Sequence, residues 1–561
     1  MAPQVASPTP DLKLQSPVPV TADSQYYGAK SPAELEENLP GGALRAGGTP
    51  SIFSRQYIGV LAHFAAVGVV YGTINGCLYA VLNDYLYMST TLVATAKALI
   101  RVPHALRVFT SIFSDCWPIF GYHRRPYLVI GWGISFISCL VMAVVPLGDP
   151  YYGDSSLEGV ELSEMTAEQL KTVNQDAHHK GVLLIVMFML AHFGTIVAYG
   201  AADGLVVELA QREPENIRGN VQGISKITSY AFTILASFMT GIGLDSEAYG
   251  GTFSWTMGFN GVMWVCTAFS LLAVPISWYL VDEEKNYVRK SFCGFLVEIY
   301  RLLHQRVYYQ FMGYVFFSQI FSSFSVTSSS AIQSTYAGVT PLNSGIASML
   351  SGFLSALAIN IWRKWGLQWN WRYIIIVCTT AVVVIDAFPT LFTIWNVYRS
   401  QWFWLGLPLL EEFPSSIGDF VTSLFVVEIT NPGQEATILG LLISVKAISQ
   451  PFATVLYKNV DSTFHIGRKF IVKDDREVHL QLTYAYIIAY AFQLFSLVFL
   501  VLLPRQKAES HALKATGGTN KWLGRFTAFY LVFAACWIVM TNILSLFDST
   551  SCLRIAGGTG C

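Results

Sequence analysis

Residues 114–128 read SDCWPIFGYHRRPYL and separate two apolar stretches. Each of these stretches has about the twenty residues that a helix needs to cross a bilayer. An aspartate, a proline, a glycine and two adjacent arginines stand together in the short segment. Basic residues between two apolar helices are typical of a connection at the membrane surface. The segment therefore predicts a short link between two membrane-spanning helices.

The whole chain has the composition of a polytopic membrane protein. Of its 561 residues, 53% are hydrophobic and 13% are charged, whereas a soluble domain carries about 25% charged residues. The apolar residues fall in blocks of about twenty, the length of a membrane-spanning helix. We predict thirteen spans, over residues 57–82, 91–114, 126–147, 181–209, 220–243, 257–281, 308–330, 344–363, 373–396, 402–429, 436–457, 483–503 and 525–547.

Charge and cysteine content exclude several other classes of protein. The net charge of -1 gives no overall field that would attract a nucleic acid. None of the nine cysteines forms a CxxC pair, which argues against a zinc or redox centre. The sequence also lacks the metalloprotease, nucleophile-elbow and phosphate-loop motifs. We therefore expect no enzyme, no metal and no cofactor.

The predicted spans form two six-helix halves with additional segments at both ends. Residues 1–55 are rich in Pro, Ser, Ala and Gly and are predicted to be a disordered tail. The N-terminal half covers residues 56–281, a central loop covers 282–307, and the C-terminal half covers 308–503. Residues 504–561 hold a linker, an extra C-terminal transmembrane helix and a short tail. In that tail, Cys552 and Cys561 either form a disulfide or remain free thiols.

The distribution of basic residues predicts the orientation of the chain. Most loop lysines and arginines fall in the N-terminal tail and in the connections after the second, fourth, sixth, eighth and twelfth spans. Because cytosolic loops carry an excess of Lys and Arg, we expect the N-terminus and the central loop to be cytosolic. The sequence contains no recognisable targeting peptide, so we expect the plasma membrane.

Parts of the two halves repeat with an offset of 220 residues. The tripeptide VVE at 206–208 recurs at 426–428, and Lys226 recurs as Lys446. Transporter folds often contain internal repeats of this kind. We expect each lysine to pair with an acid on the preceding helix, Lys226 with Glu208 and Lys446 with Glu428. The alternative is that the two lysines bind an anion.

Three polar residues of the fourth span, His192, Tyr199 and Asp203, are spaced by seven and four residues. This spacing places them on one face of a helix. The stripe recurs in the tenth span, 220 positions later, as Glu412, Asp419 and Ser423. An ionisable residue within a span is costly unless it is paired or hydrated, which makes it a candidate for function. We expect both stripes to face a central cavity, with structural pairing as the alternative.

The second span carries Lys97, Arg101 and His104 on one face and Arg107 on another, and the two arginines are the hardest to explain as surface residues. A buried arginine needs an anionic partner, and its planar guanidinium suits the two oxygens of a carboxylate. That carboxylate belongs either to the protein or to a substrate.

Two segments resemble the folate–biopterin transporter family. The stretch SDCWPIFGYHRRPYLVIGW at 114–132 is similar to that family's S-D-x-x-P-I-F-G-Y-R-R-R-P-Y-L, with His123 in place of its first arginine. Residues 201–219, AADGLVVELAQREPENIRG, resemble its A-D-G-L-x-V-E-x-A-R run, which R-G follows. The family's K-P-x-x-G before S-D is replaced by RVFTS at 107–111. More generally, the loop is similar to the G-x-x-x-D-x-x-x-R-R pattern of the major facilitator superfamily.

The resemblance implies an all-α transporter of the major facilitator type that carries folates or pterins by alternating access. A pterin ring presents a 2-amino group beside a ring N–H, and one carboxylate, Asp203 or Asp419, suits both. The glutamate tail of folate carries two further carboxylates. Arg101, Arg107 or Lys446 is suited to neutralise them.

Several points about function stay open at this stage. A buried acid such as Asp203 or Glu412 could also take up a proton, so coupling to protons is one option. S-adenosylmethionine, a cation with an adenine ring, would also suit acids and aromatic residues. A receptor that senses a nutrient without transporting it is a further alternative. We expect a monomer in the lipid bilayer with a small-molecule substrate.

The segment 114–128 is expected to form a gate at the cytosolic end of the protein. Asp115 ends the second span and is expected to pair with Arg124 or Arg125. Pro118 and Gly121 would turn the chain, and the next proline would begin the third span, where its missing N–H is harmless. Such a charge cluster would hold one conformation closed. The alternative is a topology signal in which the arginines keep the loop inside.

Overall fold

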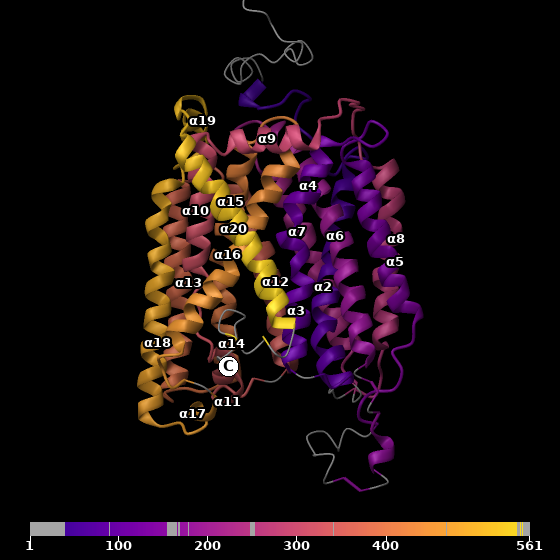
Figure 1. Cartoon of the computed structure of the whole chain (residues 1–561), viewed down its shortest axis with the longest axis vertical. Coiled ribbons are helices and arrows are strands. Elements are labelled where there is room, and N and C mark those ends of the chain that lie inside the picture. The colour runs from indigo at the N-terminus through magenta and orange to yellow at the C-terminus, as the bar shows by residue number, and fades with distance from the viewer. Residues whose placement is uncertain are drawn as a thin grey trace, which may run out of the picture.

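The computed structural model describes residues 40–88, 90–153, 165–166, 169–174, 176–177, 179–246, 249, 253–339, 341–466, 468–546, 550 and 553. Within these ranges the chain is helical, and β-pairing is limited to isolated bridges such as that between Ile119 and Tyr122. Most helices run side by side along one axis (Figure 1). The predicted all-α class is confirmed.

The N-terminal half contains the first six predicted spans. They are α2 (Ile58–Tyr79) with its π-helical end η3 (Ala80–Tyr85), α3 (Thr90–Ala105) with α4 (Arg107–Cys116), α5 (Arg125–Val144), α6 (His179–Gln211), α7 (Asn220–Gly243) and α8 (Gly258–Tyr279). Helices α5 and α6 approach closely at two glycines, since a Cβ on Gly131 would lie 2.6 Å from the Gly194 carbonyl oxygen. This contact fixes α6, which carries the polar stripe, against the core of the half.

The C-terminal half contains the next six predicted spans. They are α10 (Arg306–Ser322) with α11 (Ser329–Thr335), α12 (Pro341–Ile361) with η7 (Trp362–Gly366), α13 (Trp371–Ile394), α14 (Gln401–Gly406) with η8 (Pro408–Glu411) and α15 (Glu412–Ile429), α16 (Glu435–Asp461) with α17 (Arg468–Ile471), and α18 (Arg476–Phe495) with η9 (Ser496–Leu502). The two halves meet through α7 with α12 and through α4 and α6 with α16.

Three further helices lie outside the halves. The central loop holds α9 (Phe292–Leu302), and the C-terminal segment holds α19 (Lys507–Thr516) and α20 (Lys521–Leu546). Helix α20 leans obliquely across the bundle and contacts α10 and α16 of one half and α3 of the other (Figure 1). We call the end of the bundle that carries α9, α19 and the α4–α5 connection the α9 end; it is uppermost in Figure 1.

The structure changes one expectation about the terminal segments and does not test another. Residues 40–55 of the predicted disordered tail are packed, with Ala43 and Ile52 buried. Residues 1–39 lie outside the described part of the chain, and so do Cys552 and Cys561. The question of a disulfide between those two cysteines is therefore not addressed by the structure.

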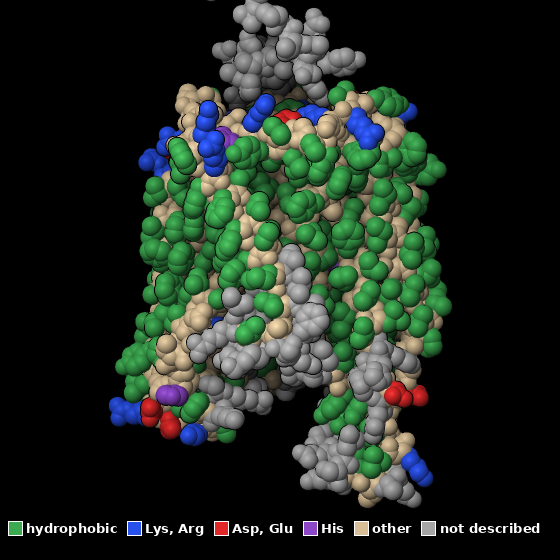
Figure 2. All heavy atoms as spheres, in the orientation of Figure 1, with side chains coloured by type: hydrophobic (Ala, Val, Ile, Leu, Met, Phe, Trp, Pro, Cys, Tyr) green, Lys and Arg blue, Asp and Glu red, His purple; other side chains and the backbone are tan. Residues whose placement is uncertain are grey.

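The surface of the bundle is that of a membrane protein. Eight helical segments within the described residues are long and apolar enough to cross a bilayer. The other predicted spans coincide with α3–α4, α7, α10, α15 and α20. Figure 2 shows hydrophobic side chains over the middle of the visible face and charged side chains at its two ends. An apolar belt between polar ends is the surface that lipid covers.

Candidate functional site

A cavity of about 190 Å³, which we call the interface cavity, lies between the two halves. Helices α6 and α7 contribute one wall, and α12, α15 and α16 contribute the other. Its lining contains Asp203, Gln222, Lys226, Tyr230, Ile359, Ser416, Asp419, Phe420, Ser423, Leu439, Leu442, Ile443 and Lys446. The structure thus brings together one acid from the α6 stripe, one from the α15 stripe and both repeat-matched lysines.

The two lysines have equivalent partners in the two halves. Lys446 Nζ donates a hydrogen bond to Asp419 Oδ1 at 2.7 Å. Lys226 Nζ donates to the Tyr199 hydroxyl and lies 4.9 Å from the centroid of that ring. In both halves the partner precedes the lysine by 27 residues. The repeat therefore extends to side-chain contacts, with Tyr199 in the place that Asp419 has in the other half.

The predicted pairing of these lysines with Glu208 and Glu428 is wrong. Glu208 accepts hydrogen bonds from Arg212 at 2.8 Å and lies 3.4 Å from Arg45. Glu428 accepts from Arg218 at 2.6 Å and from His511 at 2.8 Å. Both acids lie in the last turn of their helix, where cations of the connections reach them. The lysines lie about two turns further into the bundle.

Arg107 and Asp203 form a buried ion pair between α4 and α6. Their side chains are 1% and 4% exposed. The Arg107 guanidinium also lies 4.4 Å from the Tyr199 ring centroid and donates to the Tyr199 carbonyl oxygen at 3.4 Å. The carboxylate that Arg107 requires therefore belongs to the protein. The Arg101 side chain lies outside the described residues.

Positive charge exceeds negative charge around the interface cavity. Arg107 is paired with Asp203, and Lys446 is paired with Asp419. Among the described residues, Lys226 has no carboxylate oxygen within the 4.0 Å of a salt bridge. One cation is thus left without a carboxylate at the boundary of the two halves. Such a site favours an anionic ligand over a cationic one.

Two candidates of the stripes lie away from the interface cavity. His192 Nε2 is 3.0 Å from His104 Nδ1, and the Tyr71 ring lies 5.4 Å from the His192 ring. Glu412 begins α15 and accepts a hydrogen bond from Ser355 Oγ at 3.4 Å. Neither His192 nor Glu412 lines the interface cavity. His192 lies about three helical turns from Asp203, and Glu412 lies about two turns from Asp419, so these ends of the two stripes reach beyond the cavity.

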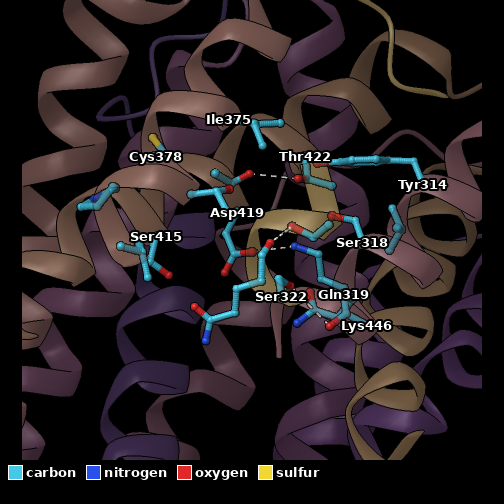
Figure 3. A pocket seen from close by; sticks show the side chains of 17 residues that line it. Tyr314, Ser318, Gln319, Ser322, Ile375, Cys378, Ser415, Asp419, Thr422 and Lys446 are labelled. Carbon is cyan, nitrogen blue, oxygen red and sulfur yellow. Dashed lines mark hydrogen bonds and ion pairs between the residues drawn. The ribbon is translucent and has the colours of Figure 1, made fainter. Parts of the chain in front are cut away.

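A second cavity of about 260 Å³ lies within the C-terminal half (Figure 3). We call it the C-half cavity. Helices α10, α13 and α15 contribute most of its lining, in which hydroxyl and amide groups alternate with apolar side chains. Asp419 and Lys446 line this cavity and the interface cavity alike, so their ion pair stands where the two meet.

The segment 114–128 links the two halves at the α9 end. Asp115 Oδ1 accepts from Arg124 Nη1 at 2.5 Å, and Oδ2 accepts from the Thr437 backbone N–H at 2.7 Å. Arg124 Nη2 also donates to Glu435 Oε2 at 3.1 Å. Arg125 instead places its guanidinium 4.7 Å from the Tyr122 ring centroid. Of the two pairings predicted for Asp115, the structure has the one with Arg124.

The turn in this segment is set by residues that follow Pro118. Gly121 has φ +82°, and a Cβ there would lie 2.7 Å from the Tyr287 ring, so only glycine fits. The second residue of α5 is a proline, as predicted. Glu283 of the central loop accepts hydrogen bonds from the backbone N–H groups of His123, Arg124 and Arg125, at 2.6, 2.9 and 3.0 Å. A carboxylate thus satisfies donors that the start of a helix leaves free.

Sequence reasoning missed a second set of links at the α9 end. Arg218, which is 1% exposed, joins the α6–α7 connection to Glu428 of the other half. From α19, Lys507 Nζ donates to the carbonyl oxygens of Glu215 at 2.6 Å and Arg218 at 3.3 Å. His511 of α19 contacts the same Glu428. The available signal was the R-G that ends the second family-like run, at 218–219.

Residues 40–48, the N-terminal strap, also contact both halves. The backbone N–H groups of Leu44 and Arg45 donate to the Gln211 carbonyl oxygen at 2.9 and 3.0 Å. Arg45 Nη1 donates to Glu435 Oε1 at 2.7 Å, and the Gly42 carbonyl oxygen accepts from Arg218. The α9 end is therefore closed by the strap, the 114–128 segment and α19 together, which we call the gate.

Glu213 gives the gate region a dependence on pH. This carboxylate accepts hydrogen bonds from the backbone N–H groups of Gly219 at 2.9 Å and Val221 at 3.0 Å. Burial outweighs these bonds and raises the pKa of Glu213 from 4.5 to about 7. The folded protein therefore holds this proton more tightly than the unfolded chain does. The contribution of the Glu213 carboxyl group to the free energy of unfolding is fully present below pH 4.5 and is lost as the pH rises through about 7.

We expect Glu213→Gln to flatten the fall in thermal unfolding temperature between pH 4.5 and pH 7, since glutamine does not titrate. Thermal unfolding of the purified protein over this range measures the effect. Glu215→Gln, an exposed acid two residues away, is the matched control and should keep the wild-type profile. An unchanged profile in Glu213→Gln would contradict the assignment.

Comparison with known proteins adds the following similarities. The model of the BT1 family matches residues 67–152, which include the segment 114–128. Folate transporter 2 of Plasmodium falciparum (isolate 3D7) is 21% identical over 441 residues, which cover 77% of this chain and 84% of that protein. Folate transporter 1 of the same organism is 20% identical over 488 residues, which cover 84% of this chain and 83% of that protein.

Solved structures show the fold. The major facilitator superfamily proton:xylose symporter XylE matches with a TM-score of 0.54 at 14% identity, over 82% of this chain and 98% of that one. The predicted family resemblance and the predicted major facilitator fold are both confirmed.

Proposed function

We propose that this chain, which has the major facilitator fold and resembles folate–biopterin transporters, is a secondary transporter that moves folates or pterins across a membrane. The interface cavity carries the proposal, because it combines a surplus cation, Lys226, with the accessible carboxylate of Asp419. Asp419 is 74% exposed, whereas Asp203 is 4% exposed and bound to Arg107. Asp419 is therefore the acid suited to the ring of a pterin.

The mechanism that we propose is alternating access. The gate closes the α9 end with buried charged links, while Asp419 in the middle of the bundle remains exposed. This arrangement corresponds to one of the two states of a rocking transporter. From the basic loops we propose that the α9 end and the N-terminus are cytosolic and that the membrane is the plasma membrane. In that orientation the structure faces outward.

Coupling to protons forms part of the proposal. His192, hydrogen-bonded to His104, and Glu412 lie in spans outside the interface cavity. Either could carry a proton without competing with the substrate for Asp419. The surplus cation disfavours S-adenosylmethionine, which is itself cationic.

Uptake measurements test the function. The chain is expressed in cells that lack folate and pterin uptake, and labelled folate, biopterin and S-adenosylmethionine are followed at two external pH values. We expect folate or biopterin to accumulate and S-adenosylmethionine not to, with faster uptake at the lower pH if protons are coupled. Surface expression without uptake of any of the three would contradict the proposal. Binding without uptake would indicate a receptor.

Asp419→Asn is expected to reduce uptake by about tenfold or more, because an amide cannot accept from both ring donors as a carboxylate does. Asp176→Asn is the matched control, since this exposed aspartate lines neither cavity and has no part in the proposed proton coupling. Near-normal uptake by Asp419→Asn would exclude a role for this acid in binding the ring.

A further inference from the structure

The two cavities are each too small for a whole folate but adjoin one another. Their volumes are about 260 and 190 Å³, whereas sites for drug-sized ligands measure about 300–1,000 Å³. Together the two cavities reach that range, and both are lined by the ion pair of Asp419 and Lys446. A ligand that fills them would consist of two joined parts, one on each side of this pair.

The C-half cavity suits a neutral, hydrogen-bonding ring. Nine of its 17 lining residues carry uncharged donors or acceptors, among them Tyr314, Ser318, Gln319, Thr379, Ser415 and Gln493. Its two charged residues, Asp419 and Lys446, already neutralise each other. Figure 3 shows this pair pointing toward each other beside Ser318, Gln319 and Ser322. A ligand group with a net charge would have no counter-ion here, while a ring with several donors and acceptors would find partners.

The interface cavity has the opposite character. Its wall includes the apolar side chains of Ile359, Phe420, Leu439, Leu442 and Ile443. At its edge the Lys226 ammonium donates to the Tyr199 hydroxyl, and an ammonium has three donors. The remaining donors are suited to a carboxylate, which would also balance the surplus charge.

We propose that the two cavities are subsites of one binding site, in which the C-half cavity receives the bicyclic ring and Lys226 receives a carboxylate of the tail. This inference rests on the proposed function and narrows it. The preferred substrate is then a conjugate of ring and anionic tail, as in folate, and an unconjugated pterin uses the ring subsite alone. Lys226 and the lining of the C-half cavity set the specificity separately.

Gly418 offers a direct way to fill the ring subsite. It lies on α15 in the lining of the C-half cavity, and a Cβ there would meet no atom within 4 Å. Leucine at this position would extend into free space, and it is a better helix former than glycine. Gly406 on α14 is equally unobstructed and lines neither cavity. Gly406→Leu is therefore a matched control for Gly418→Leu.

Equilibrium binding of folate and biopterin to the purified full chain in lipid nanodiscs tests the two subsites separately. Lys226→Met is expected to weaken folate binding by about 10- to 100-fold, the effect of losing a charge-assisted hydrogen bond. It should leave biopterin binding unchanged, and Lys226→Arg should restore folate binding. Gly418→Leu is expected to weaken the binding of both ligands, and Gly406→Leu the binding of neither.

Two results would overturn the inference. If Lys226→Met weakened the binding of folate and of biopterin equally, Lys226 would not be a subsite for the tail. If Gly418→Leu bound both ligands as tightly as the wild-type chain does, the ring would not occupy the C-half cavity. If the wild-type chain binds neither ligand, the proposed function itself fails, and this inference fails with it. The wild-type measurement thus separates the two failures.

Discussion

Arg107→Met is expected to lower the free energy of unfolding by about 3–5 kcal/mol and to remove most of the protein from the cell surface. Methionine keeps the length of the side chain but leaves Asp203 without its charged partner. That carboxylate is 4% exposed, so water cannot take the place of the guanidinium. Arg107 also contacts the Tyr199 ring that Lys226 uses, so the same change disturbs the interface cavity.

Thermal unfolding of the purified protein and quantification at the cell surface measure this loss. Lys290→Met is the matched control, because the Lys290–Glu298 pair is about 40% exposed on both sides. An exposed pair is worth about 0–1 kcal/mol, so this variant should remain close to wild type. The double variant Arg107→Met with Asp203→Leu should recover part of the stability, since neither charge of this pair is left without its partner. Wild-type stability of Arg107→Met alone would show that the pair is not buried as described.

Glu435→Gln is expected to shift the protein toward the state that is open at the α9 end. The Glu435 carboxylate is 2% exposed and accepts from Arg124 and Arg45, so it takes part in two links of the gate. In the variant, Arg124 still pairs with Asp115 and Arg45 still pairs with Glu208, so only the links from these arginines to the C-terminal half are lost. Removing a partner from a buried charge pair costs about 2–5 kcal/mol. The ratio of open to closed protein would then rise by about 30- to 5,000-fold.

Cys116 is a built-in probe for this opening. It lies next to Asp115 at the gate and is 1% exposed. Its rate of modification by a membrane-permeant maleimide, followed by mass spectrometry of the labelled peptide, should rise with the open population. Glu509→Gln provides the control, since this exposed acid lies at the same end on α19 and, among the described residues, contacts Arg505 of its own segment and none of the N-terminal half. Equal labelling rates for Glu435→Gln and wild type would contradict the role of the gate.

The sequence was most informative where partners lie close together along the chain. Asp115 and Arg124 are nine residues apart at the two ends of one short link, so their pairing follows from the motif. The 220-residue repeat also predicted that Lys226 and Lys446 hold equivalent positions, and each contacts the residue that precedes it by 27. Rotation of each helix about its axis was not predictable. For that reason Tyr199 and Asp419, rather than the two glutamates, are the partners of these lysines.

Contacts between distant parts of the chain were beyond sequence reasoning. Arg107 and Asp203 are 96 residues apart, and either could have served a substrate instead. Glu428 and Arg218 meet only because the two halves dock at the α9 end. Beyond Asp419 and Lys446, the C-half cavity gave no signal, because its other polar lining consists of uncharged side chains such as Gln319 and Gln493, each unremarkable in its own helix. Polar residues without charge become a site only once several helices bring them together.

Residues 40–48 would ordinarily be trimmed or tagged when such a protein is prepared, because they precede the first span. A chain that begins at α2 would lack Arg45 and the Gly42 carbonyl oxygen, which contact Glu435 and Arg218. Its gate would be less stable in the closed state. Transport rates and ligand affinities measured on it would then describe a protein with a different ratio of open to closed states. Tags are better placed elsewhere, and a shortened chain should be compared with the full one before its kinetics are interpreted.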